Sequence, residues 1–178
     1  MKLNGVGRIF LIYFLPVIFS ACSDKYKTVH EQFIEVNKSD LRNDTLIRET
    51  VSNSYFSRLN KPGSFGRMCV YQLSKEQEGK EFWVVFSGKT RSNYAQSNAT
   101  ITVTGRNKNH EQIYWLSLFL KGTYSEQNKW CYFKDSIHIE PAFFGKKYNS
   151  ITCVAFLPTS TAENFDIDTL HVTIKVKI

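Results

Sequence analysis

The chain lacks a hydrophobic segment long enough to cross a lipid bilayer. The apolar run from Ile9 to Phe19 has about 11 residues, whereas a membrane-spanning helix needs roughly 20. The later apolar stretch from Tyr114 to Leu120 has only the length of a strand. We therefore expect no part of the chain to span a membrane.

No block of positive charge occurs either, although the 178 residues carry a net charge of +7. The longest run of basic residues is Lys146-Lys147, whereas a nucleic-acid-binding surface needs a concentrated basic stripe. Lys2 and Arg8 lie in the segment that we assign below to a signal peptide, and without them the net charge is +5. The scattered charge indicates general solvation, and we expect no nucleic-acid partner.

Cysteine is scarce, and its spacing does not suggest a zinc site. The four cysteines form no C-x-x-C pair, and none has a metal-ligand spacing from a histidine. Apart from Cys22, an odd number remains, so an exported chain could hold at most one internal disulfide among Cys69, Cys131 and Cys153. Each lies in an apolar segment, where a free cysteine packs as a small hydrophobic residue. The sequence leaves both states open.

Motifs that carry common hydrolytic chemistry are absent. The chain has no G-x-S-x-G elbow and no His-x-x-x-His pair, and its histidines occur singly. A glycosidase needs two carboxylates at a defined separation, and the sequence favours no pair among Glu81, Asp135, Glu140, Asp166 and Asp168. We therefore expect that the protein is not an enzyme.

Residues 1–21 have the layout of a signal peptide. A positive start precedes the apolar core, and Ser20-Ala21 places small residues directly before Cys22. This sequence resembles the lipobox of bacterial lipoproteins, of the relaxed kind found in Bacteroidetes, since Phe19 stands where leucine is commonest. The resemblance implies that Cys22 carries a diacylglycerol and anchors the protein in the outer membrane, on its periplasmic or cell-surface face.

Residues 22–53 are polar and are predicted to form a tether between the lipid and the globular part. Within them, Val29, Phe33 and Val36 have helical spacing and indicate a short helix. Asp44-Thr45-Leu46 resembles the short Asp-(Ser/Thr)-aliphatic motif at which Bacteroidetes O-glycosylate exported proteins. This makes Thr45 a candidate glycosylation site.

Residues 54–178 are predicted to form one β-sandwich, because apolar residues recur there with a period of two. Turn signals such as Asn60-Lys61-Pro62-Gly63 separate the candidate strands. The predicted strands cover residues 45–51, 66–74, 81–88, 99–106, 112–121, 129–139, 150–157 and 165–177. The pattern predicts an all-β, antiparallel two-sheet architecture, without helices that alternate with the strands.

The faces of the predicted strands differ in polarity. Residues 81–88 and 112–121 are apolar on both faces, so each strand is either covered twice or presents aromatic side chains to a ligand. In residues 99–106, threonines alternate with apolar residues, which predicts one solvated and one buried face. The apolar phase slips by one residue at Asp168-Thr169, which predicts a β-bulge in the last strand.

Three segments carry a resemblance to a known family. They are Glu81 to Lys89 (EFWVVFSGK), the strand that opens at Lys129-Trp130 and ends at Ile139-Glu140-Pro141, and Asn164 to Val172 (NFDIDTLHV). Together they resemble the strands of carbohydrate-binding-module-like, galactose-binding-like jelly rolls over residues 54–178. The resemblance implies an antiparallel jelly roll of about eight or nine strands that is non-catalytic and often binds sugar.

The same resemblance bears on metal binding. Such folds often hold a structural calcium ion through paired aspartates of the final strand, and here Thr169 stands in the second position. Asp166 and Asp168 are therefore the only calcium candidates, and we expect no other cofactor.

A sugar-binding sandwich needs an exposed aromatic ring, because the apolar face of a pyranose stacks on it. The candidates are Trp83, Trp115 and Phe119 on the second faces of their strands and Tyr94, Phe143 and Phe144 in loops. The alternative is that these tryptophans pack in the core, and Trp130 matches a position that is usually buried in the resembling fold.

Two functions remain open at this point. The first is a membrane-anchored jelly roll that binds a polysaccharide or a glycan-bearing partner. The second is a structural or protein-interaction lipoprotein, such as an accessory subunit of an outer-membrane complex or an adhesin. The first predicts an exposed aromatic site beside polar groups. The second predicts no such site but an apolar patch made of loops such as residues 141–149.

Overall fold

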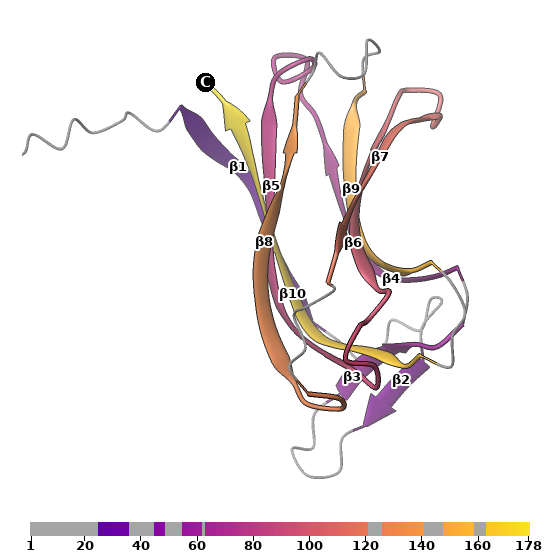
Figure 1. Ribbon diagram of the computed structural model, residues 1–178. Coiled ribbons are helices and arrows are strands. Elements are labelled where there is room, and N and C mark those ends of the chain that lie inside the picture. The colour runs from indigo at the N-terminus through magenta and orange to yellow at the C-terminus, as the bar shows by residue number, and fades with distance from the viewer. Residues whose placement is uncertain are drawn as a thin grey trace, which may run out of the picture.

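The computed structural model describes residues 25–35, 45–48, 55–61, 63–120, 126–140, 148–158 and 163–178. These residues form ten strands and no helix, which confirms the all-β prediction (Figure 1). The strands are β1 (Tyr26–Glu35), β2 (Thr45–Arg48), β3 (Tyr55–Leu59), β4 (Ser64–Gln72), β5 (Phe82–Ser92), β6 (Thr100–Arg106), β7 (Gln112–Phe119), β8 (Cys131–Ile139), β9 (Ser150–Leu157) and β10 (Phe165–Lys177).

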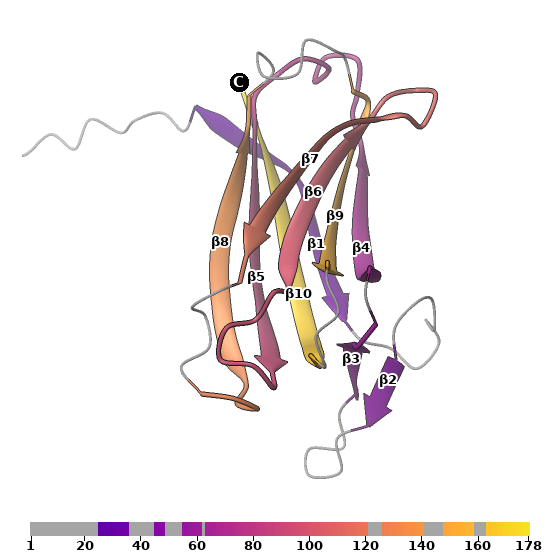
Figure 2. The same cartoon turned by 45° about the vertical axis from the view of Figure 1, so that its right-hand side comes forward.

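The strands pair into two antiparallel sheets. The six-stranded sheet has the order β2-β3-β10-β5-β8, with β1 also paired to β10, and the four-stranded sheet has the order β4-β9-β6-β7. Figure 2 shows the two sheets facing each other as the layers of a sandwich, with β2 and β3 at one end. Neighbouring strands are mostly non-consecutive in the chain, so the connections cross between the layers as in a jelly roll.

The core lies between the two sheets because strand alternation sends one set of side chains inward. In β5 and β10, Phe82, Val84, Phe86, Val172 and Ile174 are fully buried. The alternation predicted for residues 81–88 is therefore confirmed, since Trp83 and Val85 lie on the outer face and are half-buried. The four-stranded sheet contributes its own buried layer: Cys69, Ile101, Val103, Tyr114, Ile151 and Cys153.

The last strand is the central strand of the six-stranded sheet. β10 pairs with β5 along most of its length, while β3 and β1 share its other edge. The pairing with β5 shifts between Ile167 and Thr169, which confirms the β-bulge predicted at Asp168-Thr169. The bulge lets Phe165 and Ile167 face the core before it and Leu170 and Val172 after it.

The prediction of a tether with a short helix is wrong for residues 26–35. Residues 26–35 form β1, which pairs with β10 from Tyr26↔Lys177 to Glu35↔Thr169, and they form no helix. Val29 and Phe33 share no face despite their spacing: Val29 packs against the core, whereas Phe33, after the register shift between Thr28 and His30, is 67% exposed. The signal peptide, Cys22 and Val36 lie outside the described residues.

Two glycines sit where no larger side chain fits. A Cβ on Gly88 would collide with the carbonyl oxygen of Thr169 and would lie 2.9 Å from the Phe133 ring. A Cβ on Gly105 would collide with the Tyr114 ring. Both glycines therefore allow a side chain or a neighbouring strand to cross close over the backbone.

Among the described residues, no helix could span a membrane.

Candidate functional site

The outer face of the four-stranded sheet carries a continuous set of apolar side chains, which we call the aromatic face. Strand alternation, together with the register shift between Phe65 and Met68, points them away from the core: Phe65, Met68 and Val70 on β4, Phe156 on β9, and Trp115 and Phe119 on β7. Trp115 is 39% exposed and Phe119 is 62% exposed, and Met68 and Val70 are also exposed. Of the two alternatives left open for residues 112–121, the exposure of Trp115 and Phe119 agrees with outward presentation of aromatic side chains.

Three rings of the aromatic face pack against one another. The Phe65 and Phe156 rings stack with their centroids 4.6 Å apart, and Trp115 meets Phe156 edge-on at 5.4 Å. Because β6 lies between β7 and β9, Trp115 and Phe156 can meet only by leaning over β6. The rings are therefore held in place before any ligand arrives.

A row of hydroxyl groups lies beneath these rings. Thr100, Thr102 and Thr104 point outward from β6 but are almost completely buried, so the prediction that this face of residues 99–106 is solvated is wrong. Two of these hydroxyl groups bond locally: those of Thr100 and Thr102 lie 3.2 Å apart, and that of Thr102 lies 3.4 Å from the Ser117 hydroxyl. The Trp115 indole N–H donates to the Ser117 hydroxyl at 2.8 Å, which fixes the orientation of the exposed ring.

Sequence reasoning identified Trp115 and Phe119 but missed Phe65 and Phe156. Phe156 has the outward phase of its strand, so the periodicity contained a signal there. Phe65 is out of phase with the outward Met68 and Val70, and only the register shift between Phe65 and Met68 brings it to the same face. Their meeting with Trp115 depends on the strand order β4-β9-β6-β7, which no local pattern specifies.

The other predicted aromatic candidates do not join this face. Trp83 lies on the opposite sheet, where its ring stacks on His138 with the centroids 4.4 Å apart. Tyr94 is half-buried in the segment between β5 and β6. Phe143, Phe144 and the Thr45 side chain lie outside the described residues. Trp130 is half-buried under Arg91, whose guanidinium carbon is 4.5 Å from its ring.

The predicted calcium ligands are engaged by basic side chains instead. Asp166, whose side chain is 2% exposed, accepts hydrogen bonds from Arg58 Nε at 2.6 Å and from Arg91 Nε at 2.9 Å. Asp168 pairs with Lys89 at 3.0 Å. In the described part of the chain no group of three or more His, Cys, Asp or Glu side chains could hold a metal ion. These carboxylates therefore do not fit a calcium site.

The three cysteines of the sandwich are free thiols. Cys69 and Cys153 lie directly opposite each other on β4 and β9, and both are buried. Burial raises the pKa of the Cys69 thiol to about 11 and raises that of Cys153 as well. Cys131 is only half-buried. The two buried cysteines thus pack as small hydrophobic residues.

Glu81, at one end of the six-stranded sheet, has a strongly lowered pKa. Its carboxylate accepts hydrogen bonds from Lys177 Nζ at 2.6 Å and from the Tyr26 hydroxyl, and it lies 2.7 Å from His138 Nε2. These contacts, that from Lys177 first, lower the pKa of Glu81 to about 2. The cluster ties β1, β8 and β10 together, since its members come from all three strands.

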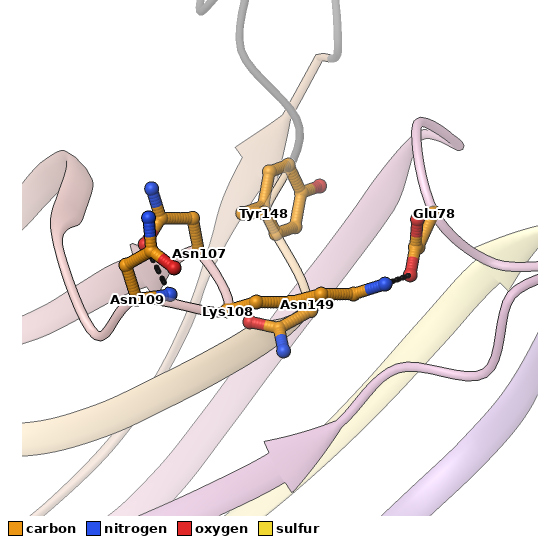
Figure 3. A pocket seen from close by; sticks show the side chains of 6 residues that line it. All are labelled: Glu78, Asn107, Lys108, Asn109, Tyr148 and Asn149. Carbon is orange, nitrogen blue, oxygen red and sulfur yellow. Dashed lines mark hydrogen bonds and ion pairs between the residues drawn. The ribbon is translucent and has the colours of Figure 1, made fainter.

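A small polar hollow of about 250 Å³ opens at the turn between β6 and β7 (Figure 3). Asn107, Asn109 and Asn149 line it, and Lys108 reaches across it to Glu78 at 3.9 Å. Among the described residues of its lining Tyr148 is the one aromatic, and it is buried, so its ring is not available for stacking. The aromatic face is therefore the stronger candidate for a binding surface.

No family model matches the chain, and no curated protein matches it in sequence. Solved structures with a similar fold include the C-terminal CBM6 of LamC, a marine laminarinase from Zobellia galactanivorans. That match has 12% identity and a TM-score of 0.41, and it covers 81% of this chain and 99% of the other.

Two further neighbours come from unrelated settings. The VP2 subviral particle of infectious bursal disease virus has 7% identity and a TM-score of 0.48, with 98% of this chain and 40% of the other covered. The Glycosylation Associate Protein (Gap123) complex from Streptococcus agalactiae has 10% identity and a TM-score of 0.46, with 83% and 44% covered. The chain spans less than half of these two proteins, and the likeness concerns the fold alone.

Proposed function

We propose that the protein is a membrane-anchored, non-catalytic lipoprotein that binds a polysaccharide or glycan-bearing partner through the aromatic face. The observation that supports this proposal most is the layer formed by Trp115, Phe65 and Phe156, with Phe119 exposed beside it. Flat, pre-positioned rings suit the apolar face of a pyranose, since little conformational entropy is lost on binding.

The size of the expected interaction follows from the exposed ring area. A tryptophan side chain presents about 200 Å² or more, and stacking on the 39% that Trp115 leaves exposed removes roughly 80 Å² from water. At about 25 cal/mol per Å² this contributes about 2 kcal/mol. Losing the ring should therefore weaken binding by at least about tenfold.

Affinity gel electrophoresis against a panel of neutral polysaccharides tests the proposal. The wild-type protein should be retarded by at least one polysaccharide, and Trp115→Ala and Phe119→Ala should each restore mobility. Tyr132→Ala is the matched control, because Tyr132 is 79% exposed but lies on the other sheet. Absence of retardation on the whole panel, or equal loss in the Tyr132 variant, would contradict the proposal.

The anchor is part of the same proposal and has its own test. Cys22 follows the small residues of a lipobox-like sequence, so we expect lipidation there and attachment to the outer membrane of a Bacteroidetes-type cell. Labelling with an alkyne fatty acid should mark the wild-type chain and not Cys22→Ser. The variant should also leave the membrane fraction, and an unchanged fractionation would count against the anchor.

A second function, docking of an envelope protein, is favoured by Met68 and Val70. These aliphatic side chains extend the aromatic face along β4 and are exposed, although they offer no flat ring to a sugar. Met68→Glu should abolish binding of a protein partner and leave retardation by polysaccharide gels unchanged. Loss of polysaccharide binding alone in Trp115→Ala would favour the glycan.

A further inference from the structure

A polar groove of about 310 Å³ lies on the outer face of the six-stranded sheet, on the side of the sandwich opposite to the aromatic face. Its lining comes from four neighbouring strands: Thr28 on β1, Ser87 on β5, Lys134 on β8, and His171, Thr173 and Lys175 on β10. Strand pairing sets Ser87 opposite both Lys134 and His171, and sets Lys175 opposite Thr28. Side chains in such pairs have Cβ atoms roughly 5 Å apart, so these groups converge on one space.

The groove has a surplus of positive charge. Lys134 and Lys175 make no ion pair with any residue that the structure describes. The one carboxylate in the lining, Glu31, lies 2.8 Å from His171 Nε2. Two ammonium groups therefore line the groove without an ion-pair partner among the described residues, against one carboxylate that His171 engages, and they suit an anionic group of a ligand.

The other groups of the groove suit a saccharide. Thr28, Ser87 and Thr173 bring short hydroxyl side chains that can exchange hydrogen bonds with sugar hydroxyl groups. Beside them the Phe33 ring is 67% exposed and stacks on His171, with centroids 3.9 Å apart and planes 1° from parallel. A flat ring held rigidly at the rim offers a stacking surface for a pyranose.

We propose that this groove is a second binding site, specific for a saccharide that carries an acidic group. Lys134 and Lys175 hold the carboxylate or sulfate of the sugar, the hydroxyl residues orient its ring, and Phe33 stacks on its apolar face. The site goes beyond the function proposed above, because it lies on the other sheet and shares no residue with the aromatic face.

Binding to three soluble polymers at low salt tests the site: polygalacturonate for carboxylates, dextran sulfate for sulfate esters, and unmodified dextran as the neutral polymer. Wild-type protein should bind at least one acidic polymer and bind dextran much more weakly. Lys134→Ala/Lys175→Ala should weaken binding by about tenfold, since hydrogen bonds to charged groups are lost. The preferred acidic polymer identifies the anionic group.

The matched control is Lys75→Ala/Lys80→Ala, which removes the same charge from exposed lysines in the turn between β4 and β5. It should change the affinity by less than about twofold. An equal loss in both double variants would mean diffuse charge attraction and would overturn the site. So would no binding of either acidic polymer, or equal binding of dextran by the Trp115→Ala/Phe119→Ala variant, in which the aromatic face is removed.

A last comparison of variants separates the proposal for the groove from the proposal for the aromatic face. Trp115→Ala/Phe119→Ala should keep the affinity for the acidic polymer, while Phe33→Ala should lower it. If the aromatic-face variant loses acidic-polymer binding and the Lys134→Ala/Lys175→Ala variant keeps it, the groove is not the site. Retention of acidic binding by a protein that binds no neutral polysaccharide would support the groove and count against the aromatic face.

Discussion

Replacing Asp166 with asparagine should destabilise the sandwich strongly for a substitution that removes no side-chain volume. The side chain is 2% exposed and takes hydrogen bonds from Arg58 and Arg91. Breaking a buried ion pair by removing one partner costs about 3–5 kcal/mol. Here the two guanidinium groups keep part of their hydration, because their side chains are 26% and 19% exposed. We therefore expect a loss of about 2–3 kcal/mol.

Urea unfolding followed by tryptophan fluorescence measures this loss, and Trp130 is a natural reporter because Arg91 covers its ring. In thermal unfolding the same loss lowers the Tm by about 5–10 °C. Asp168→Asn is the matched control. Its partner Lys89 is partly exposed, as Asp168 is itself, so that variant should lose less than about 1 kcal/mol.

Two results would refute this reasoning. One is an Asp166→Asn variant that is no less stable than Asp168→Asn. That result would mean that water solvates Arg58 and Arg91 as well as the Asp166 carboxylate does. The other is a rise in the Tm of the wild-type protein with millimolar calcium that Asp166→Asn abolishes, because a bound metal stabilises the folded state by mass action. That rise would restore Asp166 as a metal ligand.

Three further predictions concern other parts of the sandwich. The pKa of Glu81 is lowered from 4.5 to about 2, so its contribution to stability is present above pH 4.5 and lost as the pH falls toward 2. In thermal unfolding, wild-type protein should exceed Glu81→Gln at neutral pH and match it near pH 2, and a gap that widens on acidification would contradict this. Gly88→Ala should lower the free energy of unfolding by about 2–3 kcal/mol in urea, because its Cβ would collide with a β10 carbonyl, and an unchanged midpoint would show that the strands can separate. Under native conditions iodoacetamide should modify Cys131 before the buried Cys69 and Cys153, as read by mass spectrometry, and equal rates would mean that the core opens readily.

Most strands were predictable because their burial is one-sided or complete. In residues 82–92 every second side chain is buried, so the period of two gave the correct faces. The bulge near Thr169 was equally predictable, because the phase of the apolar residues changes there by one residue.

β1 and β3 were not predicted because their inward faces are not uniformly apolar. In β1, His30 stacks on Tyr71, and Ile34 is the buried apolar residue of the strand. In β3, Phe56 and Ser57 are both buried, which breaks the alternation. For such strands the pairing with β10 decides the structure, and a single sequence contains no direct record of pairing.

The site was predictable in part for the same reason. Alternation alone placed Trp115 and Phe119 on an outer face, but the hydroxyl row beneath the rings was read as solvated. The threonines become buried only when Trp115 and Phe156 lean over β6 from the strands on either side. The polar groove on the six-stranded sheet likewise forms only where four strands meet, and the sequence of no single strand indicates it.

Amide chemical-shift mapping during titration with a neutral oligosaccharide from a polysaccharide that retards the protein tests the central claim most directly. Shifts should concentrate on β6, β7 and β9, with that of the Trp115 indole N–H among the largest because this group lies in the aromatic layer and donates to Ser117. Shifts confined to β1, β5, β8 and β10, with the Trp115 indole unchanged, would contradict the assignment of glycan binding to the aromatic face.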